Sequence, residues 1–327
     1  MPRVREHTVI IGDLPTGKHN AITDVPGIRV GHTTIREEPR FHTGVTAIVP
    51  DQLPLPAAIF AGNGYGKLIG VTQVHELGEI ETPIVLTATL SAFRAADALV
   101  SWMLQQPGNE EKTSFNPLVG ETNDGYLSDI RARPITEAHV FSALDSATDG
   151  PVEEGCVGAG TGTRTMGYKG GIGTSSRIVS ASNSDDPGEK PLGPYTVGAL
   201  VQSNFGGTLT IQGRQFPAPE QEADRGSCMI VVATDAPLDA RQLDRVAKRA
   251  VFAMARVGAS FSHGSGDYGI AVSTRPNGHV PDSMLSPLFV ATMDAVEEAL
   301  LNSLFMASTT RGIKGRVVPG FNPDEVL

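Results

Sequence analysis

Gly226 and Ser227 stand at the border between two very different stretches of the chain. The residues before them, RQFPAPEQEADRG over 214–226, are polar and rich in proline, which is typical of an exposed loop. The residues after them, CMIVVAT over 228–234, form an apolar, β-branched run that is typical of a buried strand. This contrast has two interpretations: a strand simply begins here, or the chain is cut between Gly226 and Ser227 and the serine becomes a new N-terminus.

Cleavage at this bond gives the serine the base that a hydroxyl nucleophile needs. The new α-amine of Ser227 would titrate at about 8, so it could accept the proton of its own hydroxyl without a histidine. Gly226 suits an autolytic attack because no side chain crowds its carbonyl carbon. A break in an exposed loop also costs little fold stability. The sequence therefore makes Ser227 a candidate nucleophile.

A glycine-rich stretch over 155–177 resembles a phosphate-binding loop but differs in detail. It contains no Gly-Lys-Ser/Thr, and Gly158, Gly160 and Gly162 are spaced by two throughout. We expect instead that its backbone passes close to another part of the chain, which glycine permits because it has no Cβ atom.

The remaining chemical motifs are weaker. His263 in SHGSGD suggests a Ser-His-Asp triad, but no Gly-x-Ser-x-Gly turn leads from a strand into a helix. The histidines form no His-x-x-x-His pair, and Cys156 lies far from Cys228 in sequence, so no metal site is expected.

Composition limits the class of protein. The chain has 327 residues, of which 40% are hydrophobic, so it can bury a sizeable core. Its net charge of -10, without a Lys/Arg-rich stripe, argues against nucleic acid as a partner. No apolar run is long enough for a membrane span or a signal peptide, and only two cysteines are present. We expect a cytoplasmic protein without disulfides.

Hydrophobic patterns predict the elements that must position these residues. The expected strands are 46–50, 57–62, 82–90, 195–202, 208–213, 228–234 and 268–274. Helical periodicity covers 91–105, 239–258 and 287–308, with Ser91 as an N-cap and Gly258 as the end of the second helix. Residues 182–194 and 214–226 read as loops. Clusters of strands and helices favour a layered α/β sandwich.

Five motifs in one order resemble the L-aminopeptidase/D-esterase (DmpA-like) family, which includes the β-peptidyl aminopeptidases. They are AITDVPGIRVGHTT (21–34), ETPIVLTATL (81–90), GETNDGYLSDI (120–130), GAGTGT (158–163) and GSCMIVVATDAPL (226–238). The resemblance implies a four-layer αββα sandwich, similar to N-terminal-nucleophile hydrolases. It implies one domain over 1–327 that cleaves itself into a large chain, 1–226, and a small chain, 227–327. The processed chains are expected to form a homo-oligomer, a tetramer of heterodimers.

The same resemblance assigns roles to residues. Ser227 matches the nucleophile, Asn204 an oxyanion-hole amide, and Glu121 the carboxylate that binds the ammonium of the substrate. Ser265 and Asp267 match a serine and an acid near the nucleophile, although the β-peptidases have glutamate at the second position. The family has a second oxyanion donor, which is a tyrosine. Asn123 stands at that position in this sequence, and Tyr126 lies close to it.

The expected activity is therefore that of a serine aminopeptidase or amidase that acts on small peptides, amides or esters through an acyl-enzyme on Ser227. No cofactor, metal, nucleic acid or membrane is needed. Three alternatives remain: an acyltransferase like the ornithine acetyltransferases, which use threonine; a hydrolase of a pantetheine-like amide; and a binding protein without chemistry.

Overall fold

Two β-sheets packed face to face form the centre of the molecule. The computed structural model describes residues 1–180, 193–218, 226–276 and 278–325. The four-stranded sheet has the order β1 (Ile28–Glu37), β2 (Phe41–Pro50), β5 (Ile84–Ala88), β6 (Leu118–Thr122). The six-stranded sheet has the order β4 (Glu79–Ile80), β3 (Leu55–Gly64), β14 (Gly266–Ser273), β13 (Ser227–Thr234), β10 (Tyr195–Asn204), β9 (Ile172–Val179).

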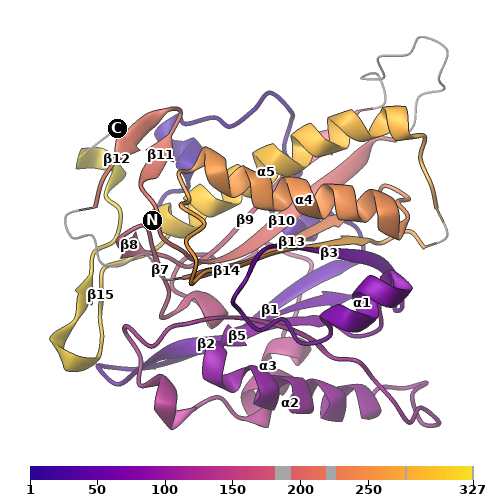
Figure 1. The fold of residues 1–327 in the computed structure, drawn as a ribbon, viewed down its shortest axis with the longest axis horizontal. Coiled ribbons are helices and arrows are strands. Elements are labelled where there is room, and N and C mark those ends of the chain that lie inside the picture. The colour runs from indigo at the N-terminus through magenta and orange to yellow at the C-terminus, as the bar shows by residue number, and fades with distance from the viewer. Residues whose placement is uncertain (181–192, 219–225, 277, 326–327) are drawn as a thin grey trace.

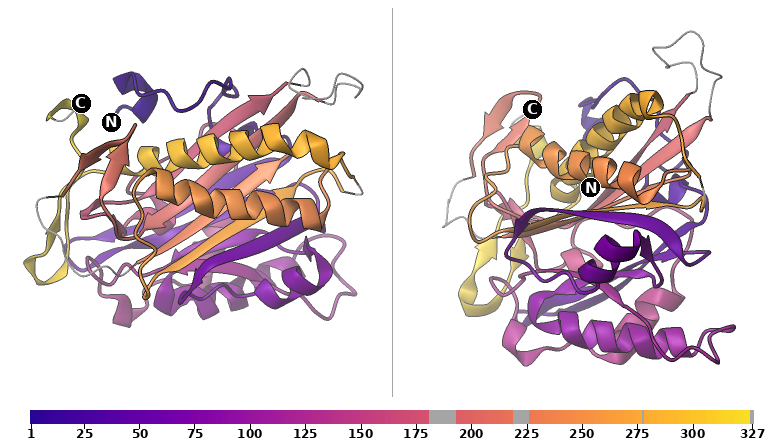
Figure 2. Two further views of the ribbon diagram at one scale, coloured as in Figure 1. Left: turned by 45° about the horizontal axis from the view of Figure 1, so that its top comes forward. Right: turned by 45° about the vertical axis from the view of Figure 1, so that its right-hand side comes forward.

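Helices cover the outer face of each sheet (Figures 1 and 2). The long helices α4 (Ala240–Arg256) and α5 (Leu285–Phe305) lie on the six-stranded sheet, and α2 (Ala92–Leu104) and α3 (Glu137–Asp145) lie on the four-stranded sheet. The short helix α1 (Val71–Leu77) packs beside β3 and β4. The four layers confirm the αββα sandwich expected from the sequence.

Three apolar cores separate the four layers. Strand β13 shows how one sequence supplies two of them: Cys228 and Ile230 pack toward α4 and α5, whereas Met229 and Val231 pack toward the four-stranded sheet. This alternation follows from the two-residue repeat of a strand. Because both faces are covered, all of β13 is buried, which explains its unbroken apolar run.

The helices begin and end largely where the sequence indicates. Asp239 caps α4, since its side chain accepts a hydrogen bond from the backbone N of Gln242 at 2.8 Å. Gly258 follows the end of α4 with φ of +92°, a conformation that favours glycine. The prediction for Ser91 was wrong in its mechanism, because it occupies the N-cap position of α2 but its side chain makes no capping hydrogen bond.

The expected strands all contain or overlap observed ones, but one expected loop contains a strand. Residues Arg214–Phe216 form β12, which pairs with β11 (Leu209–Ile211) and places Phe216 in the core. Two polar residues and proline neighbours hide this three-residue strand in the sequence. Residues 219–225, the remainder of that loop, and most of the expected loop 182–194 lie outside the described residues.

The glycine-rich stretch runs against neighbouring backbone, as predicted. A Cβ atom on Gly162 would lie 2.0 Å from the carbonyl oxygen of His42, and one on Gly160 would lie 2.4 Å from the backbone N of Ile172. These glycines let the segment pass between β2 and β9 and lead into β7 (Arg164–Thr165). The short strands β8 (Tyr168–Lys169), β15 (Thr310–Arg311) and β16 (Val317–Val318) complete the fold.

A buried ion pair fastens α5 to β9. Arg177 and Glu298 are both fully buried, and their side chains meet at 2.6 Å. Glu298 also accepts hydrogen bonds from Arg5 at 2.8 Å and from Asn20 at 2.6 Å. The carboxylate therefore neutralises two cations and joins the N-terminal segment to the helix.

We predict that Glu298→Ala lowers the free energy of unfolding by about 3–5 kcal/mol, because it leaves the Arg177 guanidinium buried without its counter-charge. The measurement is the midpoint of urea unfolding. The control is Asp51→Ala, which breaks the exposed Arg29–Asp51 pair and should cost less than about 1 kcal/mol. Equal losses in the two variants would contradict the prediction.

Candidate active site

Strand register brings the candidate nucleophile and the candidate oxyanion amide together. Ser227 is the first residue of β13 and Asn204 is the last of β10, and the two residues are direct partners in the antiparallel ladder. On its other side Ser227 pairs with Gly266, the first residue of the parallel strand β14. Three strand ends therefore converge at one point.

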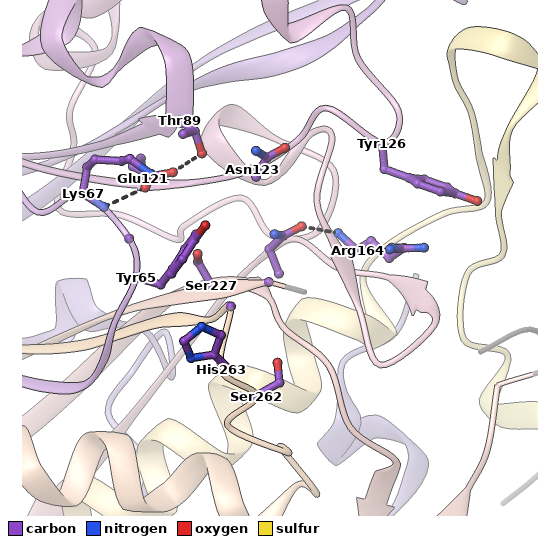
Figure 3. Close-up of a pocket in the computed structure, with 14 residues that line it drawn as sticks. Tyr65, Lys67, Thr89, Glu121, Asn123, Tyr126, Arg164, Ser227, Ser262 and His263 are labelled. Atoms are coloured by element: carbon purple, nitrogen blue, oxygen red, sulfur yellow. Dashed lines mark hydrogen bonds between the residues drawn. The ribbon is translucent and has the colours of Figure 1, made fainter. Parts of the chain in front are cut away.

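The side chain of Ser227 faces a pocket at the rim of the inter-sheet core. It is 7% exposed and lies on the same face of β13 as Met229, toward the four-stranded sheet. The pocket has a volume of about 750 Å³. Glu121, Asn123, Tyr126, Asn204, Gly226 and Ser227, all singled out in the sequence, line it together (Figure 3).

Glycines press the backbone closely around Ser227. A Cβ atom on Gly226 would lie 2.1 Å from the carbonyl oxygen of Asn204, and one on Gly266 would lie 2.4 Å from the backbone N of Gly66. Gly226 therefore has a packing role besides leaving its own carbonyl uncrowded. That carbonyl oxygen accepts a hydrogen bond from the backbone N of Gly266 at 3.2 Å.

Asn204 is held by one side of its amide. Its Oδ1 accepts a hydrogen bond from the backbone N of Arg164 at 2.9 Å. Because only the oxygen of an amide can accept from an N–H group, this contact fixes which end is which. The Nδ2 group of Asn204 is then the end that can donate to a ligand beside Ser227.

Glu121 provides a buried carboxylate on the opposite sheet. It lies in β6, and its Oε1 accepts a hydrogen bond from the backbone N of Lys67 at 2.8 Å. Its Oε2 accepts a short hydrogen bond from the hydroxyl of Thr89 (Figure 3). Two donors thus orient the carboxylate and offset part of the cost of burying it, while it still lines the pocket.

Ser265 and Asp267 lie near Ser227 but do not line the pocket. The hydroxyl of Ser265 donates a hydrogen bond to Oδ1 of Asp267 at 2.7 Å. Asp267 is 0% exposed and pairs with Cys228 across the ladder. Burial raises the pKa of Asp267 from 3.8 to about 6, although the hydrogen bond from Ser265 acts to lower it.

Asn123 and Tyr126 occupy different parts of the pocket wall. Asn123 is exposed, and its Oδ1 accepts a hydrogen bond from the backbone N of Gly125 at 2.9 Å, which leaves its Nδ2 as a donor. The ring of Tyr126 is directed away from Ser227 (Figure 3). The guanidinium carbons of Arg164 and Arg316 lie 4.0 Å and 4.5 Å from the centre of this ring.

Several lining residues carried no sequence signal. Tyr65, Lys67 and Arg164 come from loops and strand ends that only the fold brings together. Thr89, from the motif 81–90, and His263, from SHGSGD, line the pocket with them. His263 is exposed at the rim, with its ring centroid 6.1 Å from that of Tyr65. Among the described residues no hydrogen bond joins His263 to Ser227, so the triad geometry is not formed here.

Within the described ranges no group of histidine, cysteine, aspartate and glutamate side chains is arranged to hold a metal ion. Nor do those ranges contain a helix with both the length and the apolar character that crossing a bilayer requires. Cys156 and Cys228 are buried free thiols.

The sandwich and this pocket define a class of protein: a hydrolase of the N-terminal-nucleophile type, with a buried serine at the head of an inner strand. Comparison with solved structures agrees. The chain superposes with a TM-score of 0.89 and 34% identity on the L-aminopeptidase D-Ala-esterase/amidase of Ochrobactrum anthropi, described as a variant of the Ntn hydrolase fold, covering 100% of this chain and 97% of that one.

Two further similarities extend over the whole chain. The PH0078 protein of Pyrococcus horikoshii OT3 is 42% identical with a TM-score of 0.88, over 99% of this chain and 98% of that one. The beta-peptidyl aminopeptidase BapA of Sphingosinicella xenopeptidilytica is 36% identical over 99% of this chain and 90% of its own length.

Residues 20–318 match peptidase family S58, and the chain belongs to this family. It is therefore a hydrolase that acts on peptide bonds, which confirms the resemblance and the enzyme class predicted from the motifs. The predicted serine aminopeptidase or amidase activity agrees with these relatives.

The raised pKa of Asp267 predicts a pH-dependent stability. The unfolded chain releases this proton near 3.8 but the folded chain retains it until about 6, so unfolding releases a proton between these values. The contribution of Asp267 to the free energy of unfolding is therefore largest below pH 3.8, and it is lost as the pH rises through 6. Relative to wild type, Asp267→Asn should gain about 2 kcal/mol of unfolding free energy between pH 4.5 and 7.5.

Urea unfolding of both proteins across this pH range is the test, with the exposed Asp51→Asn as the matched control. Parallel stability curves for wild type and Asp267→Asn would rule out a raised pKa at this position.

Proposed function

We propose that this chain is a self-processing serine aminopeptidase that removes N-terminal residues from small peptides, amides or esters through an acyl-enzyme on Ser227. The observation that carries the proposal is the convergence of Ser227, the oriented amide of Asn204 and the carboxylate of Glu121 in one pocket. These groups supply a nucleophile, an oxyanion donor and an anchor for a substrate ammonium.

Processing begins in the uncut chain. The hydroxyl of Ser227 attacks the carbonyl carbon of Gly226, the C–N bond breaks, and an ester joins the two parts until water releases residues 1–226. The hydrogen bond from Gly266 N to the Gly226 oxygen supports this step, because it polarises the carbonyl under attack. The product chains are 1–226 and 227–327, which remain in one sandwich.

Substrate turnover uses the α-amine that processing creates. This amine takes the proton of the Ser227 hydroxyl as the oxygen attacks the substrate carbonyl, and then returns it to the leaving amine. Nδ2 of Asn204 donates to the developing oxyanion, with Nδ2 of Asn123 as the second donor. Water then hydrolyses the acyl-enzyme. A donor of this kind contributes about 10²–10³-fold to kcat.

Substrate choice begins at Glu121. Its carboxylate pairs with the free ammonium of the N-terminal residue, so blocked peptides are excluded. Relatives named as β-peptidyl aminopeptidases and as an L-aminopeptidase D-Ala-esterase support β-, L- and D-aminoacyl groups as the classes to test.

Ser265 and Asp267 act as positioning residues in this proposal. The Ser265 hydroxyl is directed to Asp267, and both lie beside the backbone that carries Ser227. Assembly of the processed chains into a tetramer of heterodimers, and a cytoplasmic location, stay predictions from the sequence.

The first test concerns the nucleophile. Purified wild type should give two fragments, split after Gly226, in denaturing mass spectrometry, and Ser227→Ala should stay whole and inactive. Ser227→Thr keeps a hydroxyl and should be cut at least partly. An intact wild-type chain with full activity, or an active Ser227→Ala protein, would disprove the mechanism; an intact and inactive chain would favour the binding protein.

The second test concerns the ammonium anchor. Glu121→Gln should lower kcat/KM for amino-acid amides by about tenfold to a hundredfold, because a charged hydrogen bond is lost, and processing should still occur. The measurement compares free and Nα-acetylated amides, with the exposed Glu37→Gln as the control. Unchanged preference for the free amine in Glu121→Gln would place the anchor elsewhere.

A further inference from the structure

Lys67 brings a cation to the side of the pocket that holds Glu121 (Figure 3). Its backbone N donates to Oε1 of Glu121 at 2.8 Å, and both residues line the pocket together with Ser227. The proposed mechanism uses only this backbone N–H. The ammonium group of Lys67 needs an explanation of its own, because a cation beside the carboxylate that anchors a substrate amine opposes the binding of that amine.

The backbone that carries Lys67 is fixed by further hydrogen bonds. The backbone N of Tyr65 donates to the carbonyl oxygen of Ser265 at 3.3 Å, and the hydroxyl of Tyr268 donates to the carbonyl oxygen of Gly66 at 2.9 Å. These two bonds tie residues 65–67 to the six-stranded sheet, whereas the backbone N of Lys67 ties them to the four-stranded one. The starting point of the Lys67 side chain is therefore set before a ligand arrives.

The ammonium group of Lys67 is available to a ligand. Its Nζ lies 5.8 Å from the centre of the Tyr65 ring, and the side chain is exposed. In the part of the chain that the structure describes, Nζ forms no ion pair with a carboxylate. Arg164 lies on the opposite wall, beyond Asn204 (Figure 3), away from the residue that Glu121 would anchor.

The position of the acyl residue follows from the anchors of the proposed function. If its ammonium lies at Glu121 and its carbonyl carbon at Ser227, the carbon that bears the ammonium lies beside Lys67. A carboxylate on that same carbon would face Lys67 while the ammonium faces Glu121, so that each charge meets its opposite.

We propose that Lys67 binds a carboxylate of the N-terminal residue and that the substrates are β-aspartyl peptides and amides. In a β-aspartyl residue the ammonium and the carboxylate share one carbon, and the scissile carbonyl lies one methylene further along. Such a residue is a β-aminoacyl group, so the proposal rests on the proposed function and narrows its substrate class. Water adds across the amide bond and releases aspartate and the leaving amine.

A purely structural role for Lys67 makes a different prediction. If its side chain only packs on Tyr65 and solvates the rim of the pocket, a carboxylate on the acyl residue should not favour turnover. The two cases are separated by the ratio of kcat/KM for a β-aspartyl substrate to that for a neutral β-aminoacyl substrate with the same leaving group.

The experiment uses three p-nitroanilides: β-aspartyl; 3-aminobutanoyl of the same configuration, in which a methyl group replaces the carboxylate; and α-aspartyl. Wild type should prefer β-aspartyl to 3-aminobutanoyl by about tenfold or more, since a charge-assisted hydrogen bond is gained. The α-aspartyl isomer, whose carboxylate lies one carbon further from the ammonium, should be the poorer isomer.

The variants test whether the preference belongs to Lys67. Lys67→Met should bring the ratio of β-aspartyl to 3-aminobutanoyl turnover to one or below, and Lys67→Arg should keep part of the preference. The matched control is Lys112→Met, which removes another exposed lysine that lies over a ring, 5.3 Å from the centre of Phe115, and should keep the wild-type ratio.

The outcomes are distinct. A wild-type ratio of one or below, with 3-aminobutanoyl p-nitroanilide cleaved, overturns the proposal but leaves the proposed aminopeptidase intact. Faster turnover of the α isomer also overturns it, as does a ratio that is unchanged in a processed Lys67→Met protein. If Lys67→Met is not processed, Lys67→Gln takes its place and must lose the preference. If wild type cleaves no aminoacyl p-nitroanilide at all, the proposed function itself fails.

Discussion

The register between β10 and β13 is the constraint on which the site depends. It sets Asn204 opposite Ser227 and turns the serine toward the inter-sheet pocket. A slip of one residue would turn Ser227 to the helix-covered face, where Cys228 now packs. The close approach of Gly226 to the Asn204 backbone resists such a slip, because any side chain there would clash.

The sandwich explains why a polar pocket can exist beside an apolar core. Ser227 and Asn204 come from the six-stranded sheet and Glu121 from the four-stranded one, so the pocket lies where the ends of both sheets face each other. A buried carboxylate at this rim needs partners. Lys67 and Thr89 supply them, from the segment after β3 and the end of β5.

The sequence predicted what depends on local pattern. The apolar run of β13 was recognisable because its burial is continuous, and α5 was recognisable from its many apolar side chains, since all of residues 298–305 are buried. The short strand β12 was missed because three residues with two exposed polar side chains show no periodicity. Motifs pointed to Ser227, whereas Arg164 and Lys67 enter the site only through tertiary contacts, which no periodicity encodes.

The side chain of Asp267 is one methylene shorter than the glutamate of the β-peptidases, which raises the question of whether it still reaches the hydroxyl of Ser265. It does, because Ser265, which immediately precedes β14, places its hydroxyl 2.7 Å from Oδ1 of Asp267. The other oxygen, Oδ2, has no hydrogen-bond partner in the part of the chain that the structure describes. Burial raises the pKa of this carboxyl, and the hydrogen bonds from Ser265 and from the Cys228 backbone offset only part of that effect. In the proposed mechanism, the influence of Asp267 on Ser227 passes through the paired strand backbone, because Asp267 lies opposite Cys228 in the ladder between β14 and β13.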